Sequence, residues 1–236
     1  MWYRVGVTIG TEAIMTEIMQ IKRPDSLSKI AEEHIRKGII KGAFRLGESL
    51  QEAKLSEVLG ISKTPIREAL AALKLQGLVE IIPQRGAFVF SLSQDDVVEL
   101  CQYRLLLETT ALERAINVSR DALLAALGDI VTQMAAARSA DSFELYLELD
   151  AEFHDTFFSY CGNHYLQEGY QKVGDIVRTM RTHLSKQSER TEKSFAEHEA
   201  IVAHLDEGRF DTALAILKRQ ITRGERSYSD LIGANQ

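Results

Sequence analysis

The chain has 236 residues, 45% of them hydrophobic and 26% charged, which is an ordinary globular composition and excludes a disordered or collagen-like chain. Its 3 prolines and 15 glycines are too few for the many tight turns of an all-β protein, so long helices are favoured. No stretch reaches the roughly 18 consecutive apolar residues that a membrane span needs. The first residues also lack the pattern of a secretory signal. The sequence therefore predicts a cytoplasmic protein of one large domain or two small ones.

Charge is divided unevenly along the chain. Residues 21–90 carry 12 Lys and Arg against 8 Asp and Glu, a net charge of +4, whereas residues 91–236 carry 15 against 24, a net charge of −9. A basic segment before an acidic one indicates two domains with different partners, the first suited to a polyanion. Cys101 and Cys161 lie in helical patterns, and we expect buried free thiols rather than a disulfide.

The basic segment begins with two predicted helices. Apolar residues recur at helical spacing over residues 26–41, with charged residues on the other face, which indicates an amphipathic helix. The segment Ser49–Glu52 has the spacing of a capping box, in which the serine oxygen accepts from the third amide. A second, short helix is therefore expected to begin there and to end at Gly60.

A third helix and a hairpin follow in the predicted order. The helix can be capped by Ser62 or Thr64, and it is expected to run to about Leu75. Two runs rich in β-branched and aromatic residues, 78–82 and 87–90, are joined by a turn that contains proline and glycine, which indicates a β-hairpin.

This order of elements is that of a winged helix-turn-helix, which presents the start of its last helix to the DNA major groove. Short polar side chains there can meet phosphates, while longer ones reach base edges. The candidate DNA contacts are Ser62, Lys63, Thr64 and Arg67 on the third helix, with Arg85 and Gly86 at the hairpin tip. Taken singly, the hydroxyls are equally explained as helix caps and the cations as a solvated face. Their occurrence together favours DNA binding.

Four motifs resemble the DNA-reading half of the GntR family of bacterial transcription regulators. They are GAFRLGESL at 42–50, LSEVLGISKTPIREAL at 55–70, LQGLV at 75–79 and PQRGAFV at 83–89. The resemblance implies that Arg67 reads guanine and that the hairpin, or wing, enters the minor groove. One departure is Ala53, where the family often has an arginine, so one DNA contact of the family is in doubt.

The acidic segment contains no proline, and its apolar residues recur at intervals of three and four, which predicts an antiparallel helical bundle able to enclose a cavity. Six helices are expected, at about 94–117, 120–138, 141–160, 163–187, 191–207 and 209–231. The fold class predicted is mainly α: an N-terminal winged helix-turn-helix, then an all-α antiparallel helical bundle. The expected domains are 25–91 for DNA binding and 92–232 for effector binding and dimerisation, after an N-terminal arm, ordered or disordered, at 1–24.

Asp150 and His154 are one helical turn apart, so their side chains point the same way, as two ligands of one metal would. His198 lies on a later predicted helix. A carboxylate with two imidazoles can hold Zn, Ni, Mn or Fe, whereas Ca and Mg prefer an all-oxygen set. Spacing alone leaves an alternative open, in which the first two form a helix-surface pair and His198 is simply packed.

The acidic segment resembles the FCD effector domain of the FadR subfamily. The motifs are RLLLE at 104–108, DAEFHD at 150–155, GNHYL at 162–166, EHEAI at 197–201 and GRFDTA at 208–213. The resemblance implies a divalent metal, Zn or Ni, held by Asp150, His154, His198 and a fourth residue. That fourth position falls on Gln220, which replaces the family's usual histidine. An amide oxygen is a weaker ligand for such metals, so loose binding or a site that works without metal stays open.

In metal-containing relatives a small carboxylate effector meets the metal and an arginine. The resemblance therefore implies effector contacts at Arg104, Asn163 and Arg181. The alternative for Arg104 is an ion pair within the bundle to a residue such as Glu108.

These observations favour a ligand-responsive repressor that binds a pseudo-palindromic operator in double-stranded DNA. It is expected to act as a homodimer, because two recognition helices must reach two half-sites. One alternative is a metal-free regulator that responds to an acyl or hydrophobic ligand. Another is a metal-dependent enzyme built on Asp150, His154 and His198, but the sequence offers no convincing nucleophile or general base beside them and no role for the basic segment.

Overall fold

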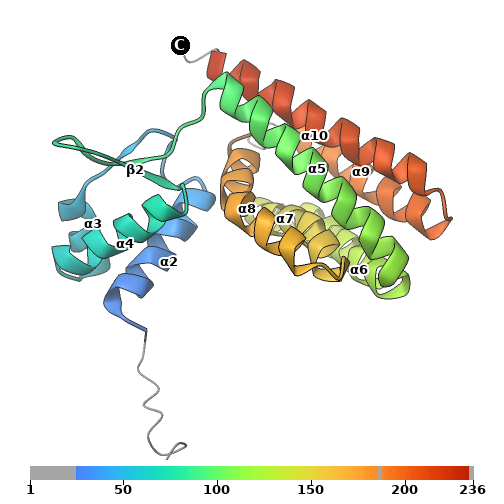
Figure 1. Ribbon diagram of the computed structural model, residues 1–236, viewed down its shortest axis with the longest axis horizontal. Helices are drawn as coiled ribbons and strands as arrows, with labels where there is room; N and C mark the ends of the chain where they lie inside the picture. The colour runs from blue at the N-terminus through green and yellow to red at the C-terminus, as the bar shows by residue number, and fades with distance from the viewer. Residues whose placement is uncertain (1–24, 185–187, 234–236) are drawn as a thin grey trace, which may run out of the picture.

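A computed structural model describes residues 25–184 and 188–233, so the arm expected at 1–24 lies outside the described residues. The chain folds as a small N-terminal part beside a larger group of long helices (Figure 1). The N-terminal part is a helix-turn-helix followed by a three-stranded wing. The mainly α fold predicted from the sequence, a winged helix-turn-helix followed by a helical bundle, is therefore confirmed.

The winged helix-turn-helix packs its elements around one apolar core. The elements are α2 (Leu27–Ile40), β1 (Ser49–Leu50), α3 (Glu52–Leu59), α4 (Lys63–Leu75), β2 (Val79–Ile82) and β3 (Gly86–Val89). The strands form an antiparallel sheet in the order β1-β3-β2. The largest fully buried side chains of this core are Ile35, Ile39, Ile66, Leu70, Leu73 and Leu78. Because these come from α2, α4 and the start of the hairpin, the core fixes α4 against the wing.

The capping box predicted at Ser49 is wrong. Ser49 and Leu50 form a short strand that pairs with β3, opposite Phe88 and Ala87. Helix α3 begins at Glu52, and Gln51 occupies its N-cap position without a side-chain hydrogen bond. Leu50 is buried in the core, so burial of this side chain and pairing of its backbone outweigh the local capping signal.

Helix α4 has Ser62 at its N-cap position, but the serine side chain makes no capping hydrogen bond. The hydroxyl is exposed instead. The hairpin turn between β2 and β3 contains Gln84 and Gly86, both with positive φ, of 61° and 103°. Backbone of this kind is tolerated by glycine and forces the tight reversal that carries the wing tip outward.

Six helices make up the bundle within residues 94–184 and 188–233, and each predicted helix ends within three residues of an observed one. They are α5 (Gln94–Val118), α6 (Arg120–Ser139), α7 (Phe143–Tyr160), α8 (His164–Leu184), α9 (Ser188–Asp206) and α10 (Phe210–Gly233). A capping box starts α5, where the amide of Asp96 donates to Ser93 Oγ and the amide of Ser93 donates back to Asp96 Oδ2.

The bundle has an apolar core of its own. Its largest fully buried side chains are Tyr228, Phe153, Phe157, Leu112, Leu123 and Leu127. Cys101 and Cys161 are buried and unbridged, as predicted. Within the described residues, none of the helices combines the length and apolar character that would let it cross a membrane.

A chain of four charged residues joins the two parts of the molecule. Arg36 on α2 donates to both oxygens of Asp175 on α8, at 2.5 and 2.8 Å. Arg178, one turn further along α8, binds Asp175 at 2.8 Å and Asp155 on α7. We call Arg36–Asp175–Arg178–Asp155 the ion chain. It connects the helix-turn-helix to α7 one residue after His154.

Candidate functional sites

The six candidate DNA contacts are all exposed, at the start of α4 and at the turn between β2 and β3. Arg67 makes one exposed ion pair, from Nε to Glu52 Oε2 on α3 at 2.7 Å. The guanidinium of Arg85 lies over the ring of Phe88, 5.6 Å from its centroid. Exposed cations and hydroxyls at a helix start and a wing tip suit binding to a DNA backbone and its grooves. Their individual contacts with DNA stay predictions.

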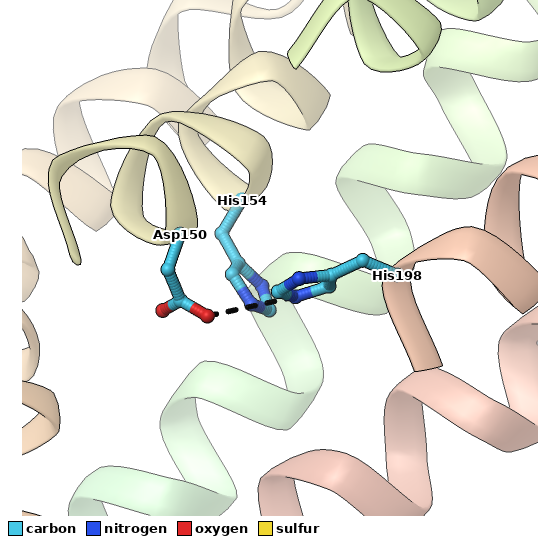
Figure 2. A group of neighbouring side chains, drawn as sticks. All are labelled: Asp150, His154 and His198. Carbon is cyan, nitrogen blue, oxygen red and sulfur yellow. Dashed lines mark ion pairs between the residues drawn. The ribbon is translucent and has the colours of Figure 1, made fainter. Parts of the chain in front are cut away.

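The three candidate metal ligands converge inside the bundle. Asp150 and His154 lie one turn apart on α7, and His198 approaches them from α9 (Figure 2). All three are buried, and one ligand atom from each lies within 4.8 Å of the others. His198 Nε2 is 3.8 Å from Asp150 Oδ1. Two ligands of one zinc ion at about 2.1 Å lie no more than about 4.2 Å apart. At tetrahedral angles such ligands lie about 3.4 Å apart, so shifts of about an ångström would gather these atoms around one ion.

Glu108 on α5 orients His154. Its Oε2 lies 2.6 Å from His154 Nδ1, and its Oε1 accepts from Arg104 Nε at 2.9 Å. A histidine that binds a metal commonly donates its other ring nitrogen to a carboxylate, which fixes the ring and leaves Nε2 as the ligand. From the sequence alone, Glu108 is predicted only as an ion-pair partner of Arg104, and this pair is present. The contact with His154 joins residues 46 apart in the chain and has no local signal.

Gln220 on α10 stands beside the three ligands. Its Nε2 donates to Ser194 Oγ at 3.1 Å and lies 3.0 Å from His198 Nε2, while its Oε1 is buried without a hydrogen-bond partner among the described residues. A half-turn of the amide exchanges the two atoms without changing its shape. The oxygen then faces the histidine, where it can serve as a metal ligand. The residues present therefore fit a divalent metal with one weak ligand.

The protonation of the site also suits a cation. Burial lowers the pKa of both histidines, that of His198 to about 3, because a charged imidazole would lose its hydration. Burial alone would raise the pKa of Asp150, but the charge of Arg181 and a hydrogen bond from Ser194 Oγ oppose it, and that pKa is lowered. Neutral imidazoles and an ionised carboxylate are the forms that bind a metal.

A cavity of about 80 Å³ adjoins these ligands, and Arg104 and Arg181 line it. Arg104 is committed to Glu108. The guanidinium of Arg181, in contrast, lies 3.7 Å from both Glu108 Oε1 and Asp150 Oδ2, and its two terminal nitrogens are buried without hydrogen-bond partners among the described residues. A planar fork of free donors is suited to a carboxylate.

The structure does not bring Asn163 to this cavity. Its Oδ1 accepts from the amides of Tyr165 and Leu166 at 3.0 and 3.2 Å, so it caps the start of α8. Arg181 lies near the other end of that helix, about 27 Å away at the helical rise per residue. Asn163 therefore has a capping role and does not line this cavity.

Two family models match the chain. The model described as "Bacterial regulatory proteins, gntR family" matches residues 27–89, and that of the FCD domain matches residues 99–223. The HTH-type transcriptional regulator YdhC of Bacillus subtilis is 28% identical over 71% of this chain and 75% of its own length. The gluconate operon transcriptional repressor of Bacillus licheniformis is 26% identical over 84% of this chain and 83% of its own length.

Solved structures of transcription regulators have a similar fold. A GntR transcriptional regulator from Rhodococcus sp. RHA1 superposes with a TM-score of 0.75 at 20% identity, covering 86% of this chain and 98% of that one. McbR/YncC of E. coli superposes with a TM-score of 0.74 at 19% identity, covering 88% and 99%. At these identities the likeness concerns the fold. It extends over both the winged helix-turn-helix and the bundle.

Proposed function

The chain belongs to the GntR family of bacterial transcription regulators and carries an FCD domain, and from this premise we propose that it is a homodimeric repressor controlled by a small carboxylate. Its residues 25–91 bind the operator, and residues 92–232 bind the effector and form the dimer. Because its relatives are regulators, the alternative of an enzyme centre at Asp150, His154 and His198 is set aside. Two relatives are named as repressors of a gluconate operon, and gluconate is a carboxylate.

One observation carries the proposal: a potential metal site and an arginine, Arg181, whose terminal nitrogens make no hydrogen bond among the described residues, share one small buried cavity. Asp150, His154 and His198 would hold the metal, with Gln220 Oε1 as the fourth ligand. A bound Zn or Ni ion would supply positive charge to one carboxylate oxygen of the effector. Arg181 donates to the carboxylate from the other side. Glu108 holds His154 in the required orientation and so acts as a positioning residue.

Coupling to DNA follows from the position of Arg181. It lies one turn beyond Arg178 on α8, and Arg178 belongs to the ion chain that ends at Arg36 on α2. An effector that draws Arg181 toward itself shifts α8. This shift moves Asp175 and therefore the contact of α8 with α2 of the helix-turn-helix. Effector and operator then change each other's affinity by the same factor, because such coupling is reciprocal.

Dimer formation is supported by an apolar surface on α5 and α8. Tyr103, Leu106 and Tyr165 are large apolar side chains that are exposed, and the hydroxyl of Tyr103 donates to the carbonyl of Gly169, which brings the two helices together there. Surfaces of this kind commonly mark interfaces. A two-fold dimer gives two recognition helices for the two halves of an operator.

Elemental analysis of the dialysed protein tests the metal. We expect about one Zn or Ni per chain, lost in His154→Ala and in His198→Ala. His164→Ala is the matched control, because His164 is exposed at the start of α8. The absence of metal from the parent after incubation with zinc and nickel would contradict the proposal. Gln220 in place of the usual histidine would then favour the second candidate, a metal-free regulator that responds to an acyl or hydrophobic ligand.

A further inference from the structure

A second and larger cavity lies where the helix-turn-helix meets the bundle. Its volume is about 450 Å³, and its walls come from the end of α2 and from α7 and α8. We call it the interdomain pocket. Pockets that bind small organic molecules commonly measure about 300–1,000 Å³. The cavity beside the metal ligands, about 80 Å³, is far below that range and has room only for a compact head group.

The interdomain pocket has an apolar surface between charged side chains, and these are paired except for Glu152, which has no ion pair among the described residues. Its apolar lining is Ile40, Phe143, Leu147 and Ala151. Lys41 is paired with Glu144 and Glu148, and Arg178 is paired with Asp155. A charged ligand therefore finds few free partners here, whereas an apolar or aromatic group gains from leaving water.

Arg181 lines both cavities. Its side chain is only 12% exposed, and its terminal nitrogens have no hydrogen-bond partner among the described residues. Burying a guanidinium with unused donors is costly, and an anionic group placed against it would relieve that cost. Arg181, whose guanidinium lies 3.7 Å from Glu108 and Asp150, thus borders the same space as the apolar walls.

We propose that the interdomain pocket is a ligand site for an amphipathic organic anion, whose acid group binds Arg181 and whose apolar body lies between α2, α7 and α8. This inference rests on the proposed function and deepens it. It assigns to the effector a body too large for the small cavity. A carboxylate with an aromatic or branched aliphatic body has the chemistry that fits.

The position of the pocket gives the ligand a direct route to the DNA-binding part. Ile40 and Lys41 end the first helix of the winged helix-turn-helix, and the remaining walls belong to the bundle. A ligand that fills the space contacts both parts, so its affinity depends on how they are arranged. Differential affinity of this kind is what shifts a conformational equilibrium.

The test uses the full-length protein and 8-anilinonaphthalene-1-sulfonate, an aromatic anion, with binding measured by equilibrium dialysis. We expect saturable binding to the parent. Leu147→Trp on α7 and Thr182→Trp on α8 fill the pocket from two of its helices, and each should weaken binding about tenfold. Arg181→Met should weaken it similarly. Leu145→Trp is the matched control: Leu145 is 44% exposed, lies on α7 and does not line the pocket, so binding should change less than about twofold.

A competition experiment separates the pocket from the small cavity. 4-Phenylbutyrate, which has a carboxylate and an apolar body, should displace the probe, whereas acetate at the same concentration should not. Absence of saturable binding, equal binding by both filled variants and the parent, or equal displacement by acetate would each overturn the proposal. Circular dichroism of each variant identifies any that fails to fold.

Failure of this inference is distinguishable from failure of the proposed function. If the filled variants keep the parent's metal content but bind the probe as the parent does, only the interdomain pocket is disproved. If the parent contains no metal and the filled variants still bind the probe more weakly than the parent, the ligand site in the interdomain pocket is supported and the metal site is disproved.

Discussion

At the DNA-reading end of the molecule every candidate contact is exposed, whereas in the bundle every candidate metal ligand is buried. Arg67 meets a single exposed carboxylate, that of Glu52. Glu108, in contrast, is fully buried and contacts Arg104, His154 and Arg181. The charged side chains of the first region are therefore hydrated, whereas those of the second are removed from water.

This difference in burial determines whether a residue that binds a ligand can be changed without a loss of folding stability. An exposed ion pair contributes little to folding, so its residues are free to be chosen for DNA. A buried ionic group keeps its charge only while its partners remain, because the desolvation penalty is large. In the bundle the same residues therefore serve both the binding site and the fold. Three substitutions probe the contrast.

Removing the shared carboxylate should have the largest effect. Glu108→Ala leaves the buried Arg104 without its ion-pair partner, and we expect the free energy of unfolding to fall by about 3–5 kcal/mol. Urea unfolding measures this loss. Glu113→Ala, an exposed acid on the same helix, should change stability by less than about 0.5 kcal/mol. A loss from Glu108→Ala as small as that of the control would show that the buried network does not stabilise the bundle.

At the exposed end, Arg67→Ala should weaken specific operator binding by about 1–3 kcal/mol and leave stability nearly unchanged. Fluorescence anisotropy on operator and scrambled duplexes separates the two kinds of binding. Lys63→Ala is a useful comparison, because loss of a phosphate contact should weaken both duplexes alike and reduce the salt dependence. Unchanged sequence preference in Arg67→Ala would sink the assignment of α4 as the recognition helix.

The smallest effect is expected where the two regions meet. Asp175→Asn removes the charge that links Arg36 to Arg178, both of which are partly exposed, so stability should fall by less than about 1 kcal/mol. Coupling should fall by about 0.5–2 kcal/mol, measured as the ratio of operator affinities of metal-loaded and metal-stripped protein. Asp129→Asn, an exposed acid on α6, is the control. An unaltered ratio would mean that the ion chain does not transmit the signal.

Local periodicity allowed much of the architecture to be predicted. Helix bounds, the Asp150 and His154 pair and the Arg104–Glu108 pair all follow from residues three or four apart on a helix, whose geometry is fixed by the backbone. The capping box predicted at Ser49 was wrong for a tertiary reason. The local pattern is present, but burial of Leu50 and pairing of its backbone with β3 place this segment in a strand.

The sequence by itself determined the family, the helical pattern and the residue types of both candidate sites. Only the tertiary structure decided which residues meet. It joined His154 to Glu108, 46 residues away, and Arg36 to Asp175, 139 residues away, and it left Asn163 as a helix cap far from Arg181. The physical reason is that periodicity fixes which face of a helix a residue occupies, whereas the neighbour of that face is set by packing of the whole core.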